Sequence, residues 1–120
     1  MTTKTEAPAT NKQRITFTAT FHPGKRAEYI KAHQEVWPGL RELMDEGGLR
    51  NYTIWATEDR IFGYYEAEYG LEHFRKVWHA SPLTAKWAAI MKDMIEIQLD
   101  PATGKPAVLE QIFLHEPGMR

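Results

Sequence analysis

One stretch of the sequence combines two side chains that can exchange protons near neutral pH. Tyr29 and His33 stand four positions apart, and Trp37 and Pro38 follow them. On an α-helix, residues four apart lie on one face, with Cβ atoms roughly 5–6 Å from each other. Histidine titrates near neutral pH, and an uncharged tyrosine can still donate a hydrogen bond. The pair therefore predicts acid–base chemistry on a ligand small enough to touch both side chains.

The elements that would position this pair follow from hydrophobic spacing. Apolar side chains alternate over residues 14–21, which predicts a strand. Helical spacing over 25–46 predicts a long helix that is kinked or restarted at Pro38 and ends at Gly47 and Gly48. The further elements we expect are strands at 49–57 and 60–69 joined by a tight turn at 58–59, helices at 71–79 and 82–94, and a last strand at 107–115.

This order of elements is typical of a ferredoxin-like α+β fold, with an antiparallel sheet and helices on one face. The strand at 60–69 carries apolar or aromatic residues on both faces, so the second face needs cover. We therefore expect two sheets to pair face to face in a homodimer. Tyr64 and Tyr65 point to opposite faces, so only one of them can line a given pocket. Residues 1–13 are expected to form a flexible N-terminal arm, and 14–120 a single domain.

The composition limits the classes of molecule that the protein is expected to bind. In 120 residues, 15 basic side chains oppose 16 acidic ones, so the net charge of −1 favours neither nucleic acid nor an anionic membrane. A small neutral partner is the simpler expectation. The sequence has no cysteine, which excludes thiolate chemistry and fits a cytoplasmic location. The histidine spacings do not predict a metal site, no Gly-rich phosphate loop follows a strand, and Ser81 is explained as a helix cap.

Several separated motifs follow one another in a specific order beyond the arm. They are Tyr29, His33, Trp37 and Pro38, then Asn51 and Tyr52, then Trp87, Met91 and Asp93, and the segment at 109–113. In these residues the sequence resembles the L-rhamnose mutarotase family, enzymes that interconvert the α and β anomers of L-rhamnose and, in related members, of sugars such as L-fucose. The resemblance implies a dimeric ferredoxin-like α/β barrel.

The resemblance implies a role for each matching residue. His33 falls on the family's proton donor, and Tyr29 and Tyr52 fall on its sugar contacts. Rhamnose enzymes commonly carry two adjacent tryptophans in the sugar pocket, but here Trp87 is followed by Ala88. The smaller residue reshapes one wall, which bears on the choice of sugar more than on the chemistry. Gly39 also departs from the family, which often has glutamate after the Trp-Pro pair.

The implied reaction opens a cyclic hemiacetal and recloses it on the other face, and it needs no metal or redox cofactor. One group must take the proton of the anomeric hydroxyl while another delivers a proton to the ring oxygen. We assign His33 as the principal acid/base, Tyr29 as its hydrogen-bonding partner or second proton-transfer group, and Tyr52 as a contact to sugar hydroxyls. Trp87 is expected to stack on the sugar, whereas Trp37 is expected to be structural.

Other readings remain open at this point. In general, a tyrosine and a histidine at this spacing are more often a packing or surface pair than a catalytic dyad, and the family resemblance reverses that preference. An L-fucose mutarotase of the same family is a close alternative. Similar dimeric ferredoxin-like folds also serve small cofactor-independent or haem-linked monooxygenases, and a non-catalytic sugar-binding module could use the same aromatic pocket.

Overall fold

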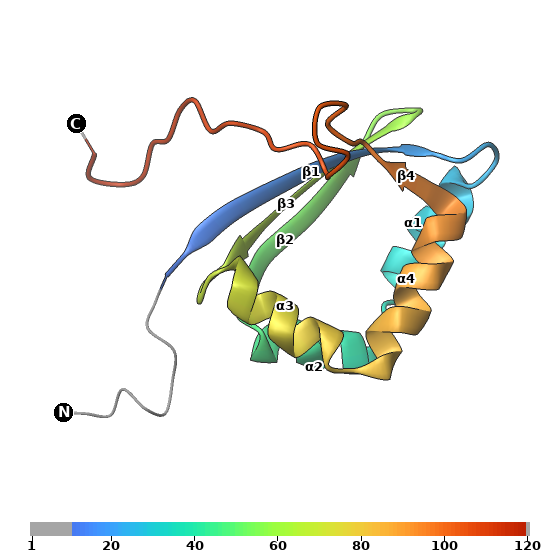
Figure 1. Ribbon diagram of the computed structural model, residues 1–120, viewed down its shortest axis with the longest axis horizontal. Helices are drawn as coiled ribbons and strands as arrows, with labels where there is room; N and C mark the ends of the chain where they lie inside the picture. The colour runs from blue at the N-terminus through green and yellow to red at the C-terminus, as the bar shows by residue number, and fades with distance from the viewer. Residues whose placement is uncertain (1–10, 120) are drawn as a thin grey trace.

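A single antiparallel sheet organises the chain, of which the computed structural model describes residues 11–119. The strands lie in the order β2-β3-β1-β4, and the helices cover one face of the sheet (Figure 1). This confirms the expected α+β class. The described elements are β1 (Gln13–Phe21), α1 (Arg26–Gln34), α2 (Pro38–Glu46), β2 (Leu49–Ala56), β3 (Arg60–Ala67), α3 (Leu71–His79), α4 (Pro82–Met94) and β4 (Ile95–Ile97).

The expected arm at 1–13 falls mostly on residues 1–10, which lie outside the described residues. Its last residues join the fold. The backbone N–H of Asn11 donates to the carbonyl of Glu68 at 3.0 Å, and Gln13 begins β1. The Gln13 side chain also accepts from the backbone N–H of Leu71 at 2.7 Å, so the start of the sheet is tied to the start of α3.

Local sequence signals set the helix boundaries. The expected helix at 25–46 is restarted at Pro38, because proline lacks an N–H and disfavours helical backbone in the residue before it. Trp37 is accordingly extended, with φ −61° and ψ 137°. Gly48 follows the end of α2 with φ +85°, a conformation that glycine adopts without a Cβ penalty. Ser81 caps α4 by accepting from the N–H of Leu83 at 3.1 Å, as expected.

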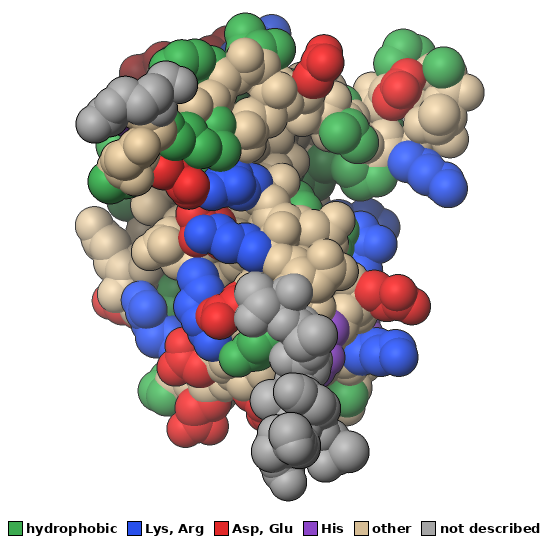
Figure 2. Space-filling view, turned by 90° about the vertical axis from the view of Figure 1, so that its left-hand side faces the viewer, with side chains coloured by type: hydrophobic (Ala, Val, Ile, Leu, Met, Phe, Trp, Pro, Cys, Tyr) green, Lys and Arg blue, Asp and Glu red, His purple; other side chains and the backbone are tan. Residues whose placement is uncertain are grey.

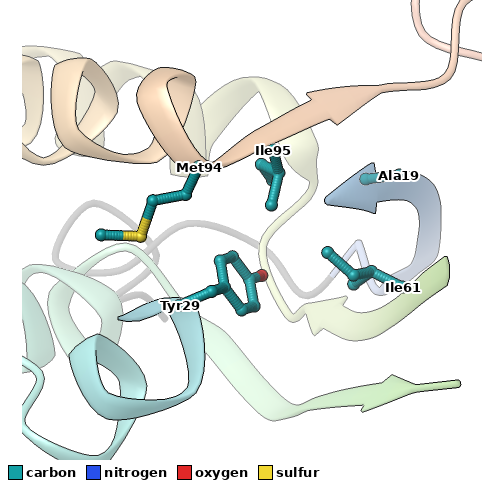
Figure 3. Close-up of a cluster of buried hydrophobic side chains, with 5 residues drawn as sticks. All are labelled: Ala19, Tyr29, Ile61, Met94 and Ile95. Atoms are coloured by element: carbon teal, nitrogen blue, oxygen red, sulfur yellow. The ribbon is translucent and has the colours of Figure 1, made fainter. Parts of the chain in front are cut away.

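The hydrophobic core lies where α1 and α4 meet the inner face of the sheet. Its buried members are Ala19, Tyr29, Ile61, Met94 and Ile95 (Figure 3). Tyr29 projects from α1 into this cluster and is only 5% exposed. The core therefore fixes the position of the helix that carries the candidate proton-transfer pair.

The last strand predicted at 107–115 is wrong for this chain. The strand after α4 is instead β4, which pairs with Ala19, Thr20 and Phe21 of β1. After an isolated bridge between Leu99 and Pro106, residues 107–115 extend away from the body of the molecule without forming a strand (Figure 1). Strand-forming composition is not sufficient, because a strand also needs an edge to pair with, and within the chain this segment does not reach one.

The surface fits the balanced net charge of the sequence. Acidic and basic side chains lie side by side on the face shown in Figure 2, so no field of a single sign forms there. Among the described residues, Nη2 of Arg14 and Oε2 of Glu116 form an ion pair 2.6 Å apart. Within residues 11–119, no helix is both long enough and apolar enough to cross a bilayer.

Candidate active site

A cavity of about 770 Å³ lies between the inner face of the sheet and the helices. It brings together all five of the site residues predicted from the sequence, which are Tyr29, His33, Tyr52, Trp87 and Ala88. They come from α1, β2 and α4, elements that are well separated along the chain. Most of the remaining wall is aromatic or aliphatic, and it includes Phe17, Met44, Leu49, Tyr65, Phe74, Trp78, Met91, Ile95, Ile97 and Leu99.

His33 is held in one tautomer by the helix that carries it. Its Nδ1 lies 2.8 Å from the backbone carbonyl oxygen of Tyr29, and a carbonyl can only accept, so Nδ1–H is the donor. In the neutral ring the lone pair is then on Nε2. Burial lowers the pKa of His33 below its ordinary value of 6.5, and the hydrogen bond to Tyr29 opposes this only in part. Neutral His33 is therefore suited to accept a proton at Nε2.

The Tyr29 side chain packs directly on His33. The two ring centroids are 4.2 Å apart, and the Phe21 ring lies 5.5 Å from the tyrosine ring between centroids, at 78° to it. Burial raises the pKa of Tyr29 to about 12. Its phenol therefore stays protonated at neutral pH and can donate a hydrogen bond beside the imidazole that accepts one.

Trp87 of α4 meets His33 from another side, with centroids 5.5 Å apart and the rings 72° to each other. Trp37 packs edge-on against Trp87 at 5.2 Å. Trp37 thus supports the wall of the cavity through Trp87, in keeping with its predicted structural role. The chain of contacts from Trp37 to Trp87 to His33 limits the rotamers available to the histidine.

A β-bulge directs Tyr52 into the cavity. Arg50 pairs with Glu66 and Thr53 pairs with Tyr64, so β2 uses one residue more than β3 over this interval. Asn51 takes the extra position with φ +51°, a conformation that asparagine tolerates better than most residues. Without the bulge, the alternation that places Leu49 inward would turn Tyr52 outward.

Tyr52 lines the cavity, and its residue is 38% exposed. Burial raises its pKa, and the neighbouring phenols of Tyr29 and Tyr65 would repel its ionised form and raise it further. The three hydroxyls therefore lie in one electrostatic neighbourhood, and all three remain neutral at physiological pH.

The two departures from the family pattern affect the structure differently. Ala88 lines the cavity, so its small side chain leaves space that a second tryptophan would fill. Gly39 is outside the cavity lining and lets α4 approach α2, since a Cβ at this position would lie 2.7 Å from Cδ2 of Leu83. Only the Ala88 departure changes the wall of the site.

Sequence reasoning missed several cavity residues. Phe74 and Trp78 stack at 5.4 Å on α3, and their spacing of four residues was a signal that they share a helix face. Strand parity left Tyr64 and Tyr65 as alternatives, and Tyr65 is the one that lines the cavity. His22, Lys92 and Glu96 supply charge or polarity to the lining, and nothing in the local sequence pointed to them.

No protein partner within residues 11–119 takes up the hydroxyls of Tyr29, Tyr52 and Tyr65 in a hydrogen bond. Tyr64, on the opposite face, instead donates to Glu66 at 2.8 Å. Enclosed polar groups nearly always have a partner, so these three are available to a ligand rich in hydroxyl groups. In the described part of the chain, no three histidine or carboxylate side chains gather closely enough to hold a metal ion.

Comparisons with known proteins agree on one family. The sequence profile of the L-rhamnose mutarotases matches residues 14–115. An L-rhamnose mutarotase of Lachnoclostridium phytofermentans is 35% identical over 89 residues, which covers 72% of this chain and 84% of that protein. One from Enterococcus faecalis is 29% identical over 102 residues, covering 81% and 93%.

A solved structure shares the fold. The crystal structure of an L-rhamnose mutarotase from Formosa agariphila superposes with a TM-score of 0.64 at 24% sequence identity. The match covers 87% of this chain and 99% of that one. The arrangement of sheet and helices described above is therefore also that of a crystallised protein.

Proposed function

The chain belongs to the L-rhamnose mutarotase family, and from this membership we propose that it interconverts the α and β anomers of L-rhamnose by general acid–base catalysis. The observation that carries the mechanism is the pairing of His33 and Tyr29 in the lining of one cavity. One presents a lone pair on a neutral imidazole, and the other presents a proton on a neutral phenol.

In ring opening, His33 and Tyr29 each carry out one of the two proton transfers. Nε2 of His33 takes the proton of the anomeric hydroxyl, the anomeric carbon forms its carbonyl, and the bond from that carbon to the ring oxygen breaks. The Tyr29 phenol gives its proton to the ring oxygen, which as an alkoxide is the stronger base. Rotation about the C1–C2 bond then presents the other carbonyl face. Closure runs the same transfers in reverse and restores both side chains.

Anomer exchange requires only a modest rate enhancement from these two side chains. Positioned acid–base groups typically contribute on the order of 10²–10⁴-fold, and anomers already exchange slowly in water. Tyr52 holds sugar hydroxyls, and Trp87 and Ala88 form a wall against the ring of the sugar. The scheme requires no metal or redox cofactor, because only protons move between the sugar and the two side chains.

Exchange spectroscopy on anomeric protons tests this function and its alternatives. With purified protein, L-rhamnose is expected to exchange faster than in buffer, and D-glucose serves as the control sugar. Faster exchange of L-fucose than of L-rhamnose would point to the L-fucose alternative. Oxygen uptake with an aromatic substrate or haem, and no anomer exchange, would favour a monooxygenase, whereas sugar binding without exchange would favour a binding module.

We also propose that the protein is a homodimer with a barrel built from two sheets. The outer sheet face bears Trp55, 68% exposed, and Phe62, 44% exposed, as expected of a surface that another sheet covers. β4 pairs only with residues 19–21, which leaves the earlier part of β1 open on that edge. The apolar segment at 107–115, with Ile112 89% exposed, is suited to pair there in a second copy.

Light scattering at micromolar concentration tests the dimer, for which twice the mass of one chain is expected. A mass equal to that of a single chain would contradict the proposed dimer. A cytoplasmic location remains a prediction from the sequence.

A further inference from the structure

Tyr65 differs from its neighbour Tyr64 in the face it occupies on β3. Tyr65 pairs with Ile15 of β1 and lines the cavity, whereas Tyr64 lies on the opposite face and donates a hydrogen bond to Glu66. The sequence resemblance assigned no role to Tyr65. Adjacent tyrosines on one strand, one inside the site and one outside it, therefore give a natural pair for comparison.

The Tyr65 ring is fixed by two aromatic neighbours. Its centroid lies 5.4 Å from that of Tyr52, with the rings 66° to each other, and 6.1 Å from that of Phe74. Tyr52 is on the adjacent strand and Phe74 on α3, so the phenol is held between sheet and helix. A ring restrained on both sides places its hydroxyl reproducibly, which is what recognition of one sugar hydroxyl requires.

Tyr52 stands between Tyr65 and the proton-transfer pair. The Tyr52 phenol interacts electrostatically with the phenols of both Tyr29 and Tyr65. The ring contacts of Tyr65 are with Tyr52 and Phe74, while those of Tyr29 are with Phe21 and His33. Tyr65 therefore makes its ring contacts with residues other than the proton-transfer pair, and Tyr52 is the site residue that it touches.

We propose that Tyr65 is a specificity residue that hydrogen-bonds, together with Tyr52, to hydroxyl groups of the sugar remote from the anomeric carbon. The inference rests on the proposed function, because it concerns the substrate of the same cavity. The ligand class is a polyol with hydroxyls on neighbouring carbons, spanned by two neutral phenols on adjacent strands. Both phenols can donate and accept, so they suit hydroxyls, which also do both.

The removal of one phenolic hydroxyl tests this role with little disturbance of packing. Tyr65→Phe keeps the ring between Tyr52 and Phe74 and removes a hydroxyl that has no hydrogen-bond partner among the described residues. A neutral hydrogen bond contributes about 0.5–1.5 kcal/mol, which corresponds to a rise in KM of roughly 2- to 12-fold. The kcat is expected to stay within about twofold, because a remote contact holds the ground and transition states alike.

Tyr64→Phe is the matched control, since it removes a hydroxyl from the same strand outside the cavity. We expect its KM for L-rhamnose to equal that of the wild type. Thermal unfolding of both variants checks that each is folded. A Tyr65→Phe enzyme with wild-type KM, or one whose loss is shared by Tyr64→Phe, would overturn the assignment.

A series of mono-deoxy L-rhamnoses identifies the contacted hydroxyl. For the analogue that lacks it, wild type and Tyr65→Phe should give equal KM values, whereas the difference should persist for the other analogues. A difference that persists for every analogue would overturn the inference.

Failure of the proposed function is recognised separately, by wild-type protein that gives no exchange. Titration of L-rhamnose followed by tryptophan fluorescence then still decides the role of Tyr65. Weaker sugar binding by Tyr65→Phe alone would support it, and equal binding, or no binding by the wild type, would reject it.

Discussion

The imidazole of His33 donates from Nδ1 to the backbone carbonyl of Tyr29 across 2.8 Å, one helical turn earlier. The same residue whose phenol can supply a proton thus fixes, through its backbone, the tautomer of the group that accepts one. A spacing of four residues on α1 is sufficient for both relationships. The two functions of the site are in this way coupled by the geometry of a single turn of helix.

The pH dependence of catalysis follows from this pair. His33 must be neutral to accept a proton, and burial lowers its pKa below 6.5, so the acid limb of kcat/KM should be centred below that pH. Burial raises the pKa of Tyr29 to about 12, so activity should not decline as pH passes 10, the ordinary value for a phenol. Exchange rates corrected for the buffer reaction at each pH provide the measurement, and an acid limb centred above 6.5 would contradict the account.

The same shift predicts how stability depends on pH. Because the folded pKa of His33 is the lower one, the unfolded chain binds more protons in mild acid. The contribution of His33 to the free energy of unfolding is therefore fully present above pH 6.5 and is lost as pH falls through the window below it. Urea unfolding of wild type and His33→Gln between pH 5 and 8 checks this, since the variant should show a smaller change.

Gly63 preserves the space that Phe17 occupies in the wall of the cavity. The two residues pair across β1 and β3, and a Cβ on Gly63 would lie 1.9 Å from the Phe17 ring. Gly63→Ala should therefore destabilise the protein by about 1–3 kcal/mol and displace the ring. In a double-mutant cycle, Phe17→Leu should reduce the cost of Gly63→Ala. Additive free energies of unfolding would show that the two residues are not coupled in this way.

A substitution of Trp55, which is outside the cavity lining, tests the proposed pairing of sheets. Trp55 is 68% exposed on the outer face of β2, so Trp55→Lys should leave the fold intact while opposing two sheets that meet there. We expect light scattering to give the mass of a single chain. Glu72→Lys, on the exposed surface of α3, is the control and should keep the mass of the wild type. An unchanged mass for Trp55→Lys would place any interface elsewhere.

The parts of the structure that were predictable from sequence have local causes. Pro38 and Ser81 set helix starts through an absent N–H and a side-chain cap, and both act within a few residues. Similarly, the spacing of Tyr29 and His33 implied a shared helix face before any fold was known. Features with local causes of this kind can be predicted from a single sequence.

The remaining features depend on distant partners. The strand at Ile95–Ile97 is three residues long, too short for an alternation pattern, and exists because β1 offers it an edge. Conversely, 107–115 has strand composition but does not reach an edge within the chain. The inward turn of Tyr52 depends on the bulge at Asn51, which shows only in the pairing of β2 with β3. Which face of β3 would close over the cavity, and so whether Tyr64 or Tyr65 lines it, was likewise a matter of tertiary packing.

A comparison of two histidine variants tests whether His33 is the acid/base of anomer exchange. Exchange spectroscopy on the anomeric protons of L-rhamnose would be recorded with wild type, His33→Gln and His79→Gln, the last on the exposed end of α3. We expect His33→Gln to lose on the order of 10²–10⁴-fold of the catalysed rate and His79→Gln to keep all of it. Full exchange by a folded His33→Gln protein would show that His33 is not the acid/base.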